Sequence, residues 1–154
     1  MKLATILVPV DGSALAEAAI PKALELADAS GARVLLLRAA QASSLPGTDP
    51  TEVQVKVVAE AEAYLARLKE RLTMPANVVV ETSVWYGPAA QAIVEAAELH
   101  RVDEIVMTTH GRSGLGRLLL GSVAESVLRS TTTPILLIRA EGAPTAKVSS
   151  REAA

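Results

Sequence analysis

The sequence predicts an α/β fold built on one five-stranded parallel sheet. Short aliphatic runs alternate along the chain with longer stretches in which apolar residues recur every three or four positions; the first pattern is typical of buried strands and the second of helices. Alternating strands and helices are joined by right-handed crossovers, so the strands are parallel and helices cover both faces of the sheet. We expect the strand order 3-2-1-4-5. Half of the 154 residues are hydrophobic, which suffices for the core of one such domain.

The predicted strands are aliphatic runs that end at turn residues. The first ends at Asp11-Gly12-Ser13, a typical turn sequence. The second contains the uninterrupted run Val34 to Leu37, which predicts burial on both faces of the sheet. The five strands are expected over residues 4–10, 33–39, 77–84, 104–109 and 135–139.

Four helices are predicted between the strands, over residues 14–29, 51–72, 87–100 and 122–130. Pro21 lies inside the first of them, where it removes a backbone hydrogen bond and is expected to kink the helix. The second follows a polar loop over residues 41–50 and carries an inward-facing stripe of residues spaced three and four apart. That stripe consists of Val53, Val57, Ala61, Tyr64, Leu68 and Leu72.

The composition excludes several classes of protein. The absence of Cys rules out disulfides and thiolate metal sites. With no Phe, one Trp, two Tyr and a formal net charge of −2, the chain is not expected to bind nucleic acid. No apolar run approaches the roughly 20 residues of a membrane span, and Pro9 interrupts the N-terminal apolar stretch, so we expect no signal peptide. We therefore expect a cytoplasmic protein with one domain over residues 1–140 and a disordered tail over 141–154.

The fold class indicates where a ligand would bind. In open α/β sheets, ligands bind beyond the carboxyl ends of the strands, at the point where the strand order reverses. In the order 3-2-1-4-5 this point lies between the first and fourth strands. The segments that leave these strands are 9–13 and 107–111.

Both segments permit a functional and a purely structural interpretation. Asp11 is suited to accept hydrogen bonds from a ribose or a base edge, and equally suited to cap the helix that follows. The segment from Gly111 to Ser122 contains four glycines before a helix starts, which fits either a phosphate cradle or a surface loop. Ser122 and Glu125 also have the spacing of a capping box. A P-loop is excluded, because Arg117 and Leu118 stand where that motif needs Lys and Ser or Thr.

The chain resembles the universal stress protein family from Ile6 to Arg139. Three stretches carry the likeness: residues 6–13, residues 111–123, and Pro134 to Arg139. In nucleotide-binding members the signature is a glycine, two residues, a second glycine, nine residues, and a glycine followed by Ser or Thr. Gly111 and Gly121-Ser122 have the required spacing, whereas Thr108 stands in the place of the first glycine. The resemblance implies a Rossmann-like fold of the adenine nucleotide alpha hydrolase type.

The resemblance also implies that the protein binds ATP, with or without Mg²⁺, as a nucleotide-sensing module in the stress response. Asp11 would contact the ribose or adenine, and neighbouring apolar residues would border the base. The glycines and Ser122 would hold the phosphates, and Arg112, Ser113 and Arg117 would reach the same anion from the intervening segment. The implied binding residues are Pro9, Val10, Asp11, Ala39, Met107, Thr108, His110, Gly111, Arg112, Ser113, Gly121, Ser122 and Val123.

Two further functions remain open at this point. No Ser-His-Asp or metal-ligand set accompanies His110 in the sequence, so an enzyme is not expected beyond slow ATP hydrolysis. The other alternative is a dimeric scaffold that does not bind nucleotide. Thr108 favours it, because this residue replaces the first glycine of the nucleotide-binding signature.

The last predicted strand would lie at an edge of the sheet, where an apolar strand needs a cover. Family resemblance implies that the same strand of a second copy supplies it, giving a symmetric homodimer. This strand contains Ile135, Leu136, Leu137 and Ile138.

Overall fold

The computed structural model describes residues 2–43, 45–111 and 120–141. Its centre is a five-stranded sheet in the order β3-β2-β1-β4-β5, in which every neighbouring pair is parallel. The predicted fold class and strand order are therefore confirmed. The strands are β1 (Thr5–Val10), β2 (Arg33–Ala40), β3 (Val80–Tyr86), β4 (Glu104–Thr108) and β5 (Ile135–Ile138).

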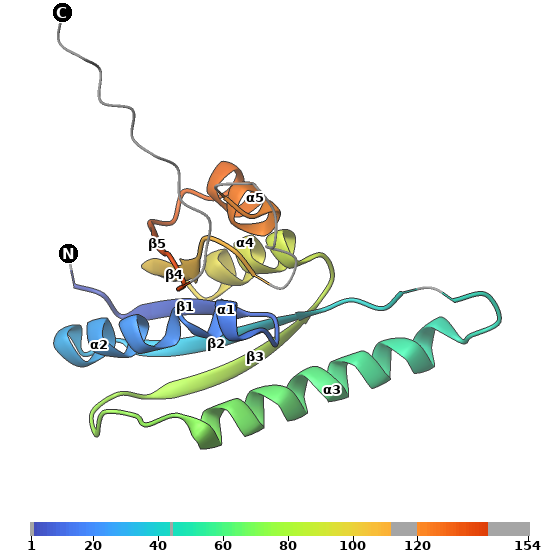
Figure 1. Cartoon of the computed structure of the whole chain (residues 1–154), viewed down its shortest axis with the longest axis horizontal. Coiled ribbons are helices and arrows are strands. Elements are labelled where there is room, and N and C mark those ends of the chain that lie inside the picture. The colour runs from blue at the N-terminus through green and yellow to red at the C-terminus, as the bar shows by residue number, and fades with distance from the viewer. Residues whose placement is uncertain (1, 44, 112–119, 142–154) are drawn as a thin grey trace, which may run out of the picture.

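Helices cover both faces of the sheet (Figure 1). On one face lie α1 (Ala14–Glu17), α2 (Ile20–Ser30) and α3 (Pro50–Arg71), and on the other lie α4 (Ala89–Leu99) and α5 (Ser122–Ser130). None of the described helices combines the length and apolar character needed to cross a membrane.

The two faces of the sheet carry separate hydrophobic clusters, because successive residues of a strand point to opposite sides. In β1, Ile6 and Val8 pack in the cluster with α2 and α3. Leu7 between them packs in the cluster with α4 and α5. All three are completely buried. The central strands are thus fixed from both sides, which holds their carboxyl ends in place at one edge of the sheet.

The first predicted helix is two helices in the structure. The chain turns at Ala18 and Ala19, where Ala19 donates its amide hydrogen to the carbonyl oxygen of Ala16 at 3.3 Å. Pro21 follows in the first turn of α2. Because Pro has no backbone N–H to bond the carbonyl of Glu17, the regular α-helical hydrogen bonding is interrupted between α1 and α2.

The third strand starts three residues later than the sequence predicts. Asn77 lies in a turn, within which the amide of Val78 donates to the carbonyl of Pro75 at 3.1 Å. The pairing of β3 with β2 begins at Val80, opposite Val34. The aliphatic character of residues 78–79 therefore does not mark strand residues.

Candidate functional site

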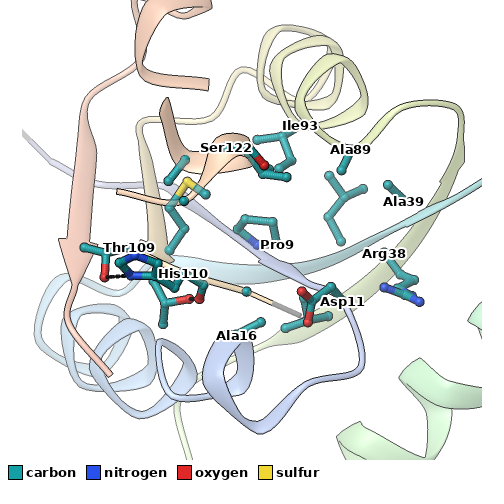
Figure 2. Close-up of a pocket in the computed structure, with 18 residues that line it drawn as sticks. Pro9, Asp11, Ala16, Arg38, Ala39, Ala89, Ile93, Thr109, His110 and Ser122 are labelled. Carbon is teal, nitrogen blue, oxygen red and sulfur yellow. Dashed lines mark hydrogen bonds between the residues drawn. The ribbon is translucent and has the colours of Figure 1, made fainter. Parts of the chain in front are cut away.

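A cavity of about 470 Å³ opens at the carboxyl ends of β1, β2 and β4, on the side of α4 and α5. It lies at the junction of β1 and β4, where the strand order reverses and where this fold class places ligands. Figure 2 shows Asp11 and Arg38 on one side of the cavity and Ser122 on the other, with Pro9 between them. The lining residues are Pro9, Val10, Asp11, Ala16, Leu37, Arg38, Ala39, Ala89, Ile93, Met107, Thr108, Thr109, His110, Gly111, Gly121, Ser122, Val123 and Ala124.

The structure brings the predicted site residues together around this cavity. Every one of them lines it except Arg112 and Ser113, which lie outside the described residues, as does Arg117. Seven lining residues were not predicted: Ala16, Leu37, Arg38, Ala89, Ile93, Thr109 and Ala124. Strand alternation from Ala39 points to Leu37, and Ala89 and Ile93 share a helix face. The contribution of Arg38 depends on tertiary packing, which carries no local sequence signal.

Asp11 organises the turn at the start of α1. One of its carboxylate oxygens accepts hydrogen bonds from the backbone amide of Ser13, at 2.9 Å, and from the Ser13 hydroxyl. Ser13 is the N-cap of α1, and its hydroxyl oxygen accepts from the amide of Ala16 at 3.1 Å. The capping interpretation of Asp11 is therefore wrong, since Ser13 caps the helix and Asp11 holds Ser13. The carboxylate itself lines the cavity.

The glycines at the two ends of the glycine-rich segment occupy positions without room for a side chain. A β-carbon at Gly111 would collide with the carboxylate of Asp11. At Gly121 it would approach the carbonyl oxygen of Thr109 to 2.9 Å, while the Gly121 amide donates to that same oxygen at 2.7 Å. Glycine here allows a close approach of two backbone segments.

The N-terminus of α5 forms one wall of the cavity. Gly121 is its N-cap, without a side-chain hydrogen bond, so the predicted capping box at Ser122 is wrong because Ser122 already lies inside the helix. Glu125 instead accepts a hydrogen bond from Arg129 at 2.8 Å. The first intrahelical bond runs from the Glu125 amide to the Gly121 carbonyl at 2.9 Å. The amides of residues 122–124 precede it and have no helical acceptor, which makes this end of the helix suited to an anion.

The end of β4 is buried and internally hydrogen-bonded. Thr108 donates its hydroxyl to the carbonyl oxygen of His110 at 2.6 Å, and Nδ1 of His110 lies 3.0 Å from the hydroxyl of Thr109. All three residues are buried. Among the described residues other than glycine, only Arg101 has a positive φ, so the backbone at Thr108 does not require glycine.

Arg38 reaches from β2 toward α3. Its guanidinium lies 5.7 Å from the ring centroid of Tyr64, within the range of a cation–π contact. The Tyr64 hydroxyl donates to Oε1 of Glu17 at 2.8 Å. Burial, reinforced by the neighbouring Glu17 carboxylate, raises the pKa of Tyr64 above its ordinary value. Tyr64 therefore stays a neutral donor and ties α3 to the helix that follows Asp11.

The described residues contain no group of three or more His, Asp or Glu side chains suited to a metal ion. The polar groups around the cavity are instead a carboxylate, a guanidinium, hydroxyls, an imidazole and the helix amides. This combination is chemically suited to a ligand with hydroxyl groups at one end and an anion at the other.

Comparison with known proteins identifies the family. A sequence model of the universal stress protein family matches residues 3–139. The chain belongs to this family. The universal stress protein MJ0531 of Methanocaldococcus jannaschii is 31% identical over 137 residues, which cover 87% of this chain and 81% of that protein. The family that the sequence motifs predict is thus confirmed.

Solved structures of the family share the fold. The universal stress protein UspA from Lactobacillus plantarum superposes with a TM-score of 0.79 at 26% identity, covering 90% of this chain and 99% of that one. A universal stress protein crystallised in complex with cAMP is also 26% identical, with a TM-score of 0.59, covering 90% of this chain and 98% of that one. At least one similar protein of this family therefore binds an adenine nucleotide.

Proposed function

We propose that this universal stress protein is a cytoplasmic, nucleotide-sensing module that binds ATP, or a related adenine nucleotide, in the cavity between β1 and β4. The observation that carries the proposal is that the anion-suited N-terminus of α5 and the Asp11 carboxylate line one cavity. The complex of a related protein with cAMP supports the same ligand class.

The chemistry of the cavity orients the nucleotide. Its phosphates bind at Gly121 and Ser122, where the helix amides attract negative charge, and stay away from Asp11, whose carboxylate repels them. The ribose hydroxyls then donate to Asp11. The adenine ring lies against the apolar wall that includes Pro9, Ala39 and Ile93, all of which line the cavity.

Calorimetric and thermal-shift titrations with ATP, ADP, AMP and cAMP, each with and without Mg²⁺, test this function. A free nucleotide concentration of about 100 times Kd adds about 2.7 kcal/mol to the free energy of unfolding. This raises the Tm of a domain of this size by about 5–10 °C. Asp11→Asn weakens binding by about tenfold, because a charged acceptor becomes neutral. Asp28→Asn, on the exposed surface of α2, is the matched control. No binding heat and no thermal shift at about 1 mM nucleotide would overturn the proposal.

We propose further that the protein is a homodimer paired through β5. This strand lies at the edge of the sheet, and its four aliphatic residues are only half-buried in the isolated chain. An apolar edge strand is a template for pairing with another chain, and a two-fold antiparallel pairing of β5 with itself satisfies its open backbone groups.

Sedimentation of the full chain tests the dimer. The native protein is expected to sediment at twice the monomer mass, whereas Leu136→Lys places a charge in the β5 strand of each copy and shifts the population to monomer. Val55→Lys on α3, an exposed valine away from this edge, leaves the dimer intact. A native monomer at micromolar concentrations would contradict dimerisation without touching the proposed nucleotide site.

A further inference from the structure

A second groove adjoins the cavity on the side of the sheet that faces α3. Its volume is about 560 Å³, and it lies between the carboxyl ends of β1 and β2 and the middle of α3. Ser13 and Gln41 line it from the strand ends, and Val57, Glu60 and Tyr64 line it from α3. Neither the sequence motifs nor the proposed function assigns a ligand to this groove.

The wall of the groove is held in place by contacts among its own residues and with Glu17, which does not line it. Tyr64 is anchored by its hydrogen bond to Glu17 at 2.8 Å, and its ring lies below the guanidinium of Arg38 at 5.7 Å. Arg71 adds an ion pair with Glu17 at 3.5 Å. Because these contacts join α1, β2 and α3, the groove is a built feature of the fold rather than a gap between loosely packed helices.

The groove and the cavity share a boundary. Asp11, Arg38 and Ala39 line both of them. In the proposed function, on which this inference rests, the ribose hydroxyls point at Asp11. A substituent on one ribose hydroxyl would therefore leave the cavity at Asp11 and enter the groove, while the other hydroxyl still donates to Asp11.

The charges of the groove restrict the substituent. Two carboxylates, Asp11 and Glu60, and one guanidinium, Arg38, line the groove, so an additional anion is disfavoured. Val57, Ala61 and the Tyr64 ring supply apolar surface on α3. We propose that the groove binds an uncharged acyl group carried on the 2′- or 3′-hydroxyl of the bound adenine nucleotide, which makes ribose-acylated nucleotides a ligand class of this protein.

The test compares ADP with 2′(3′)-O-(N-methylanthraniloyl)-ADP, whose aromatic acyl group is uncharged. The acylated nucleotide binds the native protein about tenfold more tightly, since its ring buries on the order of 60 Å² of apolar surface. Val57→Trp fills the groove and removes this gain while leaving the affinity for ADP unchanged. Val55→Trp is the matched control, because Val55 is 65% exposed on the same helix and does not line the groove.

A second comparison tests the role of charge. Adenosine 3′,5′-bisphosphate is expected to bind the native protein more weakly than AMP, because its 3′-phosphate meets the negative charge of the groove. Glu60→Lys reduces this difference in affinity between the two nucleotides. Glu62→Lys makes the same change of charge at an exposed position of α3 and has no such effect. This comparison stands even if Val57→Trp does not fold.

Three results overturn the inference: the acylated nucleotide binding no more tightly than ADP, Val57→Trp weakening both nucleotides equally, or the bisphosphate binding more tightly than AMP. Each of them leaves the binding of ADP and AMP by the native protein in place. Loss of all nucleotide binding by the native protein would instead overturn the proposed function, so the two failures are distinguishable.

Discussion

The carboxylate of Asp11 occupies the space that a β-carbon at Gly111 would need. The two residues lie 100 positions apart in the sequence, at the ends of β1 and β4. Their contact joins the two segments that the sequence indicates as the ligand site. It also gives Gly111 a structural requirement that does not depend on phosphate binding.

Gly111→Ala is expected to destabilise the protein by about 1 kcal/mol, because the Asp11 carboxylate must shift away from the new β-carbon and weaken its hydrogen bonds from Ser13. In an Asp11→Ala background the same substitution costs much less, because the colliding carboxylate is gone. A double-mutant cycle by urea denaturation measures this coupling. Equal costs in both backgrounds would show that the collision with Asp11 is not the cause.

Thr108→Gly is expected to leave ATP affinity unchanged or lower it. The Thr108 hydroxyl holds the carbonyl of His110 at 2.6 Å, and no positive φ at this position calls for glycine. Thr108→Val, which keeps the shape and removes the hydroxyl, costs about 1–3 kcal/mol by leaving a buried carbonyl without its donor. A large gain in ATP affinity for Thr108→Gly, measured by calorimetry, would instead favour the scaffold alternative.

Stability is expected to fall at high pH because of Tyr64. Its pKa in the folded protein is raised above that of the unfolded chain, first by burial and then by Glu17. The unfolded state therefore loses this proton first, and the contribution of Tyr64 is complete below pH about 10 and declines above it. Tyr64→Phe flattens this part of the profile of unfolding free energy against pH. An unchanged slope above pH about 10 in the variant would contradict the assignment.

Ser13→Ala is expected to cost about 1 kcal/mol, because α1 loses its N-cap. The hydroxyl accepts from the Ala16 amide and also donates to Asp11. Ser130→Ala, at the exposed end of α5, controls for the loss of a serine hydroxyl as such. Thermal unfolding compares the two, and equal Tm values would contradict the capping role of Ser13.

The sequence predicts the α/β class and the parallel sheet because hydrophobic periodicity and the alternation of element types are strong signals. That alternation alone does not select one strand order, since more than one doubly wound order is compatible with it. The residues at which individual strands and helices begin and end are predicted less well. The aliphatic pair at residues 78–79 resembles the start of a strand, yet the turn that starts at Pro75 delays β3 to Val80. Likewise, Pro21 signals an interruption in the first helix, but it does not predict that the interruption falls at residues 18–19.

The residues of the candidate site also fall into those that the sequence predicts and those that it does not. Asp11, Gly111 and Gly121 are predictable because the turn chemistry and the glycine spacing are visible in the sequence. Arg38 is not, since its place at the boundary of two cavities depends on Tyr64 and Glu17 from other elements. The capping box at Ser122 misleads, because the same spacing occurs where Gly121 is the actual N-cap.

Calorimetric titration of ATP into the native protein, Ser122→Ala and Ser122→Pro most directly tests whether the amides of α5 hold the phosphates. Pro is well tolerated at the first helical position, and Gly121 before it already has the extended backbone, with φ −66 and ψ 155, that Pro requires. We predict a Tm without nucleotide close to native in both variants, a modest loss of ATP affinity when the hydroxyl is removed, and a further loss of about tenfold when the amide hydrogen is also removed. Native-like ATP binding by Ser122→Pro would contradict this account.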